Sequence, residues 1–201
     1  MNLPNKLTVF RILLVPVFVV LFIYTSIPLN FLWAFIVFTI ASLTDLLDGK
    51  IARKYNLVTT FGKLMDPLAD KILVMAAMLC FVGQKTTPAW VVILILSREF
   101  LVTSLRLVAA GDGLVIAADI WGKVKTVTQM LWVIFTLLAV WTQSDQALLF
   151  PNHPVSYSAP PAPVIILLVV SELLMWAAVT FTVLSGFNYC YKNRNVFLRD
   201  I

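Results

Sequence analysis

Four aspartates between residues 45 and 70 have the residue type and spacing of a metal-assisted site. Asp45 and Asp48 are three residues apart, and Asp66 and Asp70 are four apart. On two helices these spacings place each pair on one face, because positions i, i+3 and i+4 of a helix align. If the helices run antiparallel, four carboxylates converge, and each raises the pKa of its neighbours. A hard divalent cation removes this conflict, so the pattern predicts oxygen-ligated Mg²⁺ or Mn²⁺.

Small residues accompany the aspartates on the same helix faces. Gly49 and Ala52 continue the face of the first pair, and Gly62 continues the face of the second. Small side chains at these positions would let a bulky ligand approach the backbone. Two metal ions fit four carboxylates and would clamp a diphosphate during in-line displacement. The competing interpretation is a network of salt bridges at helix ends, and it gives no reason for the small residues.

These residues belong to a chain with the composition of a polytopic membrane protein. Of its 201 residues, 61% are hydrophobic and 12% are charged. A soluble domain carries about twice that share of charge, and the mean hydropathy here is +0.94. A span needs about 20 apolar residues. We expect one all-α domain over residues 1–201 with six transmembrane helices, at about residues 7–26, 28–47, 64–83, 88–109, 121–142 and 161–186.

The lysine and arginine residues are distributed unevenly between the two sides of these spans. Only Lys85 falls in a loop on the side opposite to the termini. The positive-inside rule therefore places both termini in the cytoplasm. The four aspartates then lie at the cytoplasmic ends of their helices, so we expect the active-site cavity to open to the cytosol.

Several other classes of protein fit the sequence less well. Cys80 and Cys190 are far apart and His153 is the single histidine, so a cysteine or histidine metal site is not expected. The net charge of +5 reflects basic residues that flank spans, which gives no reason to expect nucleic acid. A cation transporter also carries intramembrane acids, but usually near the midplane and often between repeated halves. The acids here cluster at one side, and the chain has no internal repeat.

A second group of charged residues surrounds the connection between the fourth and fifth spans. Arg98 and Arg106 are eight residues apart, hence on nearly the same helix face. Glu99 points about 100° away from Arg98 on a helix, so a contact between these neighbours is possible but unusual. Lys123 and Lys125 point to nearly opposite sides, so only one of them should enter a common pocket, although basic residues at a helix start are also ordinary orientation signals. Two arginines and a lysine would suit a phosphate group on an acceptor.

Residues 45–70 resemble the signature of the CDP-alcohol phosphotransferase family. The pattern D-x2-D-G-x2-A-R-x8-G-x3-D-x3-D is matched at every fixed position. The resemblance implies a six-helix membrane fold, usually dimeric, that exchanges CMP for an alcohol on a lipid diphosphate. It also implies two metal ions per site, held by Asp45, Asp48, Asp66 and Asp70, with Asp70 as the general base for the acceptor hydroxyl. The residues that it implies around CDP-diacylglycerol are Asn5, Thr8, Arg11, Asp45, Gly49, Ala52, Arg53 and Gly62.

Further blocks resemble the branch of this family that uses glycerol phosphate as the acceptor. They are residues 2–11, Ser97-Arg98-Glu99, Leu105-Arg106 and 122–126, whereas the chain beyond about residue 130 reads as generic apolar helix. This likeness implies transfer of a phosphatidyl group to sn-glycerol 3-phosphate in a bacterial cytoplasmic (inner) membrane, by a homodimer embedded in the lipid bilayer. The acceptor phosphate would bind Arg98, Arg106 and Lys123. Serine, phosphatidylglycerol and inositol phosphate remain alternative acceptors; the basic residues disfavour serine, and inositol phosphate stays open on physical grounds.

Overall fold

The computed structural model describes a bundle of long helices. It describes the backbone of residues 3–54, 60–111, 120–151 and 160–192, and the side chains of residues 6–44, 69, 71–108, 120–151 and 160–192. All regular structure in these parts is helical. The elements are α1 (Leu3–Ile23), α2 (Asn30–Lys54), α3 (Thr60–Gly83), α4 (Ala89–Gly111), α5 (Ile120–Ser144), the short α6 (Gln146–Leu149) and α7 (Ala162–Lys192).

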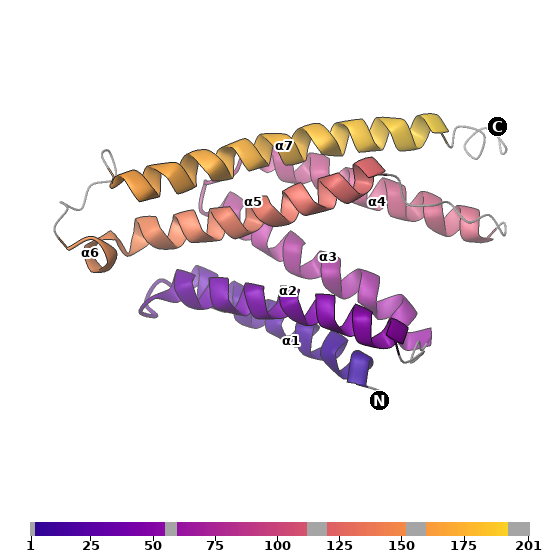
Figure 1. The fold of residues 1–201 in the computed structure, drawn as a ribbon, viewed down its shortest axis with the longest axis horizontal. Coiled ribbons are helices and arrows are strands. Elements are labelled where there is room, and N and C mark those ends of the chain that lie inside the picture. The colour runs from indigo at the N-terminus through magenta and orange to yellow at the C-terminus, as the bar shows by residue number, and fades with distance from the viewer. Residues whose placement is uncertain (1–2, 55–59, 112–119, 152–159, 193–201) are drawn as a thin grey trace.

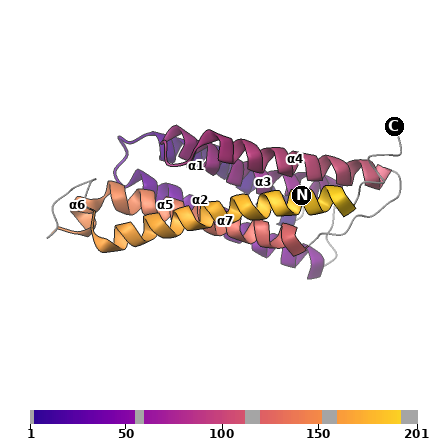
Figure 2. The ribbon, with the colours of Figure 1, turned by 90° about the horizontal axis from the view of Figure 1, so that it is seen from above.

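The long helices run back and forth along one axis (Figure 1). Figure 2 shows the same alignment from the second direction. Helix α1 packs on α2 and α3, α5 packs along α7, and α4 contacts α3 and α7. Helix α1 begins and α7 ends at the same end of the bundle, where α2 also ends and α3 begins (Figure 1). The motif segments of α2 and α3 therefore share this end with the last turns of α7.

An aromatic core holds the other half of the bundle together. The ring of Phe22 lies 5.1 Å from that of Phe31 and 5.9 Å from that of Phe81, centroid to centroid. Phe81 in turn lies 6.2 Å from Trp132. These rings come from α1, α2, α3 and α5 and are almost completely buried. Because lipid tails are as apolar as these side chains, close packing rather than water exclusion stabilises such contacts in a membrane.

The outer surface of the bundle is apolar. Leu13, Leu107, Leu173 and Phe187 each expose between 61% and 74% of their surface. A soluble protein rarely exposes apolar patches of such extent, whereas in a bilayer they would face lipid tails. Within the described residues, three helices are long and apolar enough to cross a membrane, namely Lys6–Ile23, Ile120–Ser144 and Ala162–Lys192. Asn30–Thr44 and Lys71–Gly83 are shorter apolar stretches.

The helix limits differ from the predicted spans where polar residues continue a helix. Helix α2 extends to Lys54 and α3 begins at Thr60, so the aspartate motif is more helical than the apolar runs alone indicated. Helix α7 continues to Lys192, well beyond residue 186. The predicted loop after the fifth span also contains the short helix α6. Hydropathy measures the part of a helix that suits lipid, and the backbone hydrogen bonds of a helix need no apolar side chain.

Candidate active site

The motif aspartates lie on two neighbouring helices. Asp45 and Asp48 belong to α2, and Asp66 and Asp70 belong to α3, which contacts α2. The side chains of these four residues lie outside the described part, as do those of Asn5, Gly49, Ala52, Arg53 and Gly62. Their convergence on a metal therefore stays a prediction, and the described site begins one residue later, at Lys71.

Lys71 connects the aspartate helix with α4. Its ammonium group lies 3.5 Å from the Glu99 carboxylate and donates a hydrogen bond to the hydroxyl of Thr103. Glu99 and Thr103 are four residues apart, so they present neighbouring groups on one face of α4. Two contacts on that face thus hold Lys71, the residue that follows Asp70.

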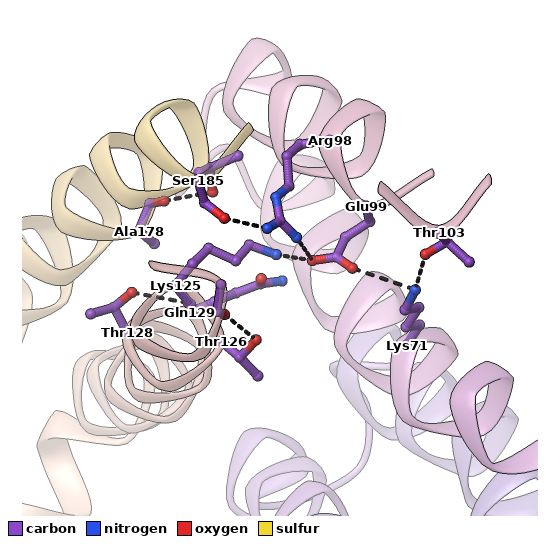
Figure 3. A network of polar contacts seen from close by, with 12 residues as sticks. Lys71, Arg98, Glu99, Thr103, Lys125, Thr126, Thr128, Gln129, Ala178 and Ser185 are labelled. Carbon is purple, nitrogen blue, oxygen red and sulfur yellow. Dashed lines mark hydrogen bonds and ion pairs between the residues drawn. The ribbon is translucent and has the colours of Figure 1, made fainter. Parts of the chain in front are cut away.

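Glu99 is the centre of a charged group that we call the Glu99 cluster, made of Glu99, Lys71, Arg98 and Lys125. The Nη1 atom of Arg98 lies 3.6 Å from Glu99, and the ammonium group of Lys125 donates to the same carboxylate oxygen. Figure 3 shows the cations of α3, α4 and α5 around this carboxylate. Three cations and one carboxylate leave a formal charge of +3 − 1 = +2. Adjacent residues on a helix do meet here: Nη1 of Arg98 reaches Glu99, while its Nη2 donates to Ser185 of α7.

The two lysines of α5 point to different sides, as predicted. Lys125 is fully buried and Lys123 is exposed. Gln129, one turn after Lys125, is buried on the same face and donates to the sulfur of Met78. The lysine beside Arg98 and Glu99 is therefore Lys125. Binding of the acceptor phosphate by Lys123 stays a prediction.

Arg98 is fixed by residues of α5 and α7. Its Nη2 atom donates to the hydroxyl of Ser185, as Figure 3 shows. A Cβ atom on Gly122 would lie 3.4 Å from Nη2, and one on Gly186 would lie 3.4 Å from Cγ of Arg98. The side chain therefore passes beside a glycine of α5 and a glycine of α7. Its buried Nε has no acceptor among the residues whose side chains are described, so a bound anion would satisfy this donor.

Arg106 lies two turns further along α4 and is exposed. Its guanidinium carbon sits 5.7 Å from the ring centroid of Tyr189, a buried residue of α7. This distance is within the range of cation–π attraction. Because Arg106 is exposed, its guanidinium group is accessible to an anion.

Two of the predicted nucleotide residues are buried near the start of α1. Thr8 and Arg11 are almost fully buried, although Arg11 is charged. The Nε of Arg11 donates to the backbone carbonyl of Ala41, at 3.3 Å. Ala41 lies about one helical turn before Asp45 on α2. The structure thus brings Arg11 to the helix that carries the first half of the motif.

The donor set favours the aspartates as the metal ligands. Among the described residues no group of three or more histidine, cysteine, aspartate or glutamate side chains could hold a metal ion. Glu99 is the acid nearest to the motif on α4, and three cations already surround it. A divalent cation is repelled from such a position. The carboxylates of Asp45, Asp48, Asp66 and Asp70 are hard oxygen donors and fit Mg²⁺ or Mn²⁺.

Sequence reasoning did not assign a role to the last helix. Ser185 and Gly186 lie beside Arg98 and Tyr189 lies beside Arg106, but all three belong to an apolar run that matches no motif. The available signal was the Ser185-Gly186 pair itself. Small residues in membrane helices mark places where two helices approach closely.

The chain belongs to the CDP-alcohol phosphatidyltransferase family, whose sequence profile matches residues 1–184. A relative from Bacillus subtilis (strain 168) is 45% identical over 96% of this chain and 95% of its own length. A relative from Rickettsia bellii (strain RML369-C) is 35% identical over 94% of this chain and 93% of its own. Both bear the name CDP-diacylglycerol–glycerol-3-phosphate 3-phosphatidyltransferase. A Mycobacterium tuberculosis (strain ATCC 25618 / H37Rv) protein, named as a probable phosphatidylglycerophosphate synthase, is 35% identical over 100% of this chain and 83% of its own.

Proposed function

We propose that this protein transfers the phosphatidyl group of CDP-diacylglycerol to sn-glycerol 3-phosphate, giving phosphatidylglycerol phosphate and CMP. The observation that carries the proposal is the pair of arginines Arg98 and Arg106, which α7 contacts from one side of α4, on the helix whose Glu99 lies 3.5 Å from Lys71, the residue after Asp70. Two guanidinium groups suit a dianionic phosphate monoester. The names of the relatives favour the same acceptor.

The donor lipid binds through the motif helices and the start of α1. The buried Arg11, which contacts α2 before the motif, supports this location. The residues that we assign to the CDP portion are Asn5, Thr8, Arg11, Asp45, Gly49, Ala52, Arg53 and Gly62. The small residues in this set leave the backbone open to the diphosphate.

The reaction is an in-line displacement at the phosphorus that carries the diacylglycerol. A hydroxyl oxygen of the acceptor forms a new bond to this phosphorus, and the bond to the bridging oxygen breaks, so that CMP leaves with the electron pair. Asp70 takes the proton of the attacking hydroxyl. Asp45, Asp48, Asp66 and Asp70 would hold two Mg²⁺ or Mn²⁺ ions, which supply charge neutralisation at the phosphoryl oxygens.

The acceptor phosphate binds to Arg98 and Arg106, with Lys123 as the third cation. Both arginines project from one side of α4, and α7 contacts each of them. Arginine suits a phosphate because its planar fork can donate two parallel hydrogen bonds. Serine lacks a phosphate and would leave these cations without a counter-ion. Inositol phosphate would satisfy them equally, so the experiment below separates it from glycerol 3-phosphate.

The architecture that we propose has six transmembrane helices, α1 to α5 and α7, with both termini in the cytoplasm. Helix α1 begins and α7 ends at one end of the bundle (Figure 1), which supports an even number of crossings. In the sequence, the lysines and arginines are concentrated in the segments predicted for the side of the termini. The positive-inside rule requires this of the cytoplasmic side. The site then opens to the cytosol, where a soluble phosphorylated alcohol is accessible. We place the protein, as a homodimer, in the bacterial cytoplasmic membrane.

The reaction is tested with purified protein in detergent, CDP-diacylglycerol and Mg²⁺. CMP release is followed with glycerol 3-phosphate, inositol phosphate, serine or phosphatidylglycerol, each with and without EDTA. We expect metal-dependent release with glycerol 3-phosphate alone. Release with another acceptor would retain the metal chemistry but contradict the assigned acceptor. Release that EDTA leaves unchanged would contradict the metal site.

A further inference from the structure

Each arginine of the proposed acceptor site rests against a side chain of α7. Arg98 donates to the hydroxyl of Ser185, and Arg106 lies 5.7 Å from the ring centroid of Tyr189. Ser185 and Tyr189 are almost fully buried and are four residues apart, hence on one face of α7. The same stripe of α7 therefore contacts both arginines, although these are two turns apart on α4.

The hydroxyl of Ser185 is used differently from other hydroxyls of α7. Ser171, Thr180 and Thr182 donate to backbone carbonyls three or four residues earlier in α7 itself. Such bonds satisfy a polar side chain within one apolar helix. Ser185 instead accepts a hydrogen bond from a charged group of another helix. Hydrogen bonds to charged groups are about twice as strong as neutral ones, so this contact can determine the orientation of the guanidinium group.

Arg98 is packed between α5 and α7. Gly122 of α5 and Gly186 of α7 each lie beside the side chain, where a Cβ atom would be in van der Waals contact with it at 3.4 Å. Its other terminal nitrogen, Nη1, lies 3.6 Å from Glu99. The guanidinium group is thus held at both terminal nitrogens and flanked by two glycines. Its position follows from α5 and α7 as much as from α4.

We infer that Ser185 and Tyr189 are positioning residues, which hold Arg98 and Arg106 so that both guanidinium groups bind one acceptor phosphate. This inference rests on the proposed function, because it concerns the acceptor site of that reaction. Neither α7 side chain is required to touch a substrate. Their loss weakens binding of the phosphorylated acceptor while the metal site and the donor lipid site stay intact, since these are built from α1, α2 and α3.

The test compares steady-state kinetics of Ser185→Ala and Tyr189→Leu with the wild-type protein. For each variant, CMP release is measured against glycerol 3-phosphate and, separately, against CDP-diacylglycerol. A cation–π contact contributes about 0.5–2 kcal/mol, so Tyr189→Leu should raise KM for glycerol 3-phosphate about two- to thirtyfold. Ser185→Ala should raise it about tenfold. KM for CDP-diacylglycerol should stay within about twofold in both variants.

Two further variants separate positioning from general damage to α7. Tyr189→Phe keeps the ring and should retain the wild-type KM for glycerol 3-phosphate. Tyr191→Leu is the matched control, because Tyr191 is an exposed tyrosine of the same helix that stacks on Phe187. It should leave both KM values unchanged. Equal KM values for the wild type and for Ser185→Ala and Tyr189→Leu would overturn the inference, and so would a parallel rise of both KM values.

The wild-type control distinguishes a failure of this inference from a failure of the proposed function. If wild-type protein releases no CMP with glycerol 3-phosphate, the proposed function is wrong. The inference about Ser185 and Tyr189 is then wrong as well, because it concerns the acceptor site of that reaction. Active wild-type protein with a Tyr189→Phe variant as impaired as Tyr189→Leu overturns the role of the ring face. Active wild-type protein with the expected split between the two KM values supports the positioning role.

Discussion

Lys125 of α5 is completely buried, and its ammonium group donates to the Glu99 carboxylate of α4. Lys71 and Arg98 lie 3.5 and 3.6 Å from the same carboxylate. One acid therefore connects three helices, through a lysine of α5 that is removed from water and a lysine of α3 that keeps 32% of its side chain exposed. A buried charge without its partner is strongly destabilising, so this pair fixes how α4 and α5 meet.

Replacement of Glu99 by Gln should destabilise the protein, because Lys125 would keep a buried charge without its carboxylate. Breaking a buried pair on one side costs about 3–5 kcal/mol. Thermal unfolding in detergent should show a lower Tm than for Glu172→Gln, a matched change at an exposed acid of α7. The double variant Glu99→Gln with Lys125→Met should recover part of the loss. An unchanged Tm in the single variant would show that the pair does not stabilise the bundle.

The two lysines of α5 should respond differently to substitution. Lys123 is exposed, so Lys123→Ala should leave Tm unchanged and raise KM for glycerol 3-phosphate about tenfold, as loss of one phosphate contact does. Lys125→Ala should lower Tm, because it removes the buried partner of Glu99. Kinetics and thermal unfolding of both variants check this. If only Lys125→Ala raised KM for the acceptor at unchanged Tm, Lys125 would replace Lys123 as the phosphate ligand.

Replacement of Asp70 by Asn should abolish turnover, because an amide cannot take the proton of the acceptor hydroxyl. The expected loss is at least about a hundredfold in kcat, as for removal of a general base. Binding of CDP-diacylglycerol, measured by its protection against thermal unfolding, should persist. Asp145→Asn is a control at a distant carboxylate, beside α6 at the other end of the bundle (Figure 1). Full activity of Asp70→Asn would remove this residue as the base.

Replacement of Arg106 by Ala should raise KM for glycerol 3-phosphate about tenfold or more while KM for the donor lipid changes little. Arg106→Lys should recover only part of the loss, because an ammonium group cannot form two parallel hydrogen bonds to a phosphate. Arg106 is exposed, so the fold should tolerate both changes. Steady-state kinetics with each substrate varied in turn provide the measurement. Equal effects on both KM values would contradict the acceptor assignment.

Much of the fold could be predicted because helices depend on local sequence. Each of the six apolar segments corresponds to a long helix of the described chain, from α1 (Leu3–Ile23) to α7 (Ala162–Lys192). The predicted ends of the helices were less accurate than their existence. In α2, for example, the polar stretch to Lys54 remains helical. Apolar runs indicate what suits lipid, whereas backbone hydrogen bonds and the charged motif decide where a helix stops.

The candidate site was predicted in part. Helical periodicity correctly separated the directions of Lys123 and Lys125, since residues two apart lie about 200° apart on a helix. It could not show which of them meets Glu99, because that depends on which face of α5 is buried in the bundle. The contact between Arg98 and Glu99, possible but unusual for neighbours on a helix, could not be settled for a similar reason. Neighbouring side chains diverge along an isolated helix, and here Nη1 of Arg98 reaches Glu99 while its Nη2 donates to Ser185 of α7.

The sequence by itself determined the family, because the spacing of Asp45, Asp48, Asp66 and Asp70 is local and the pattern is specific enough to identify it. It also determined that the chain suits a membrane, since composition requires no knowledge of contacts. Only the tertiary structure decided that Glu99 joins Lys71, Arg98 and Lys125, and that Ser185 and Tyr189 of α7 contact the two arginines. Residues that contact each other here are up to 87 positions apart in the chain, as Arg98 and Ser185 are. Periodicity within one helix carries no information about such distant partners, which only the packing of one helix face on another brings together.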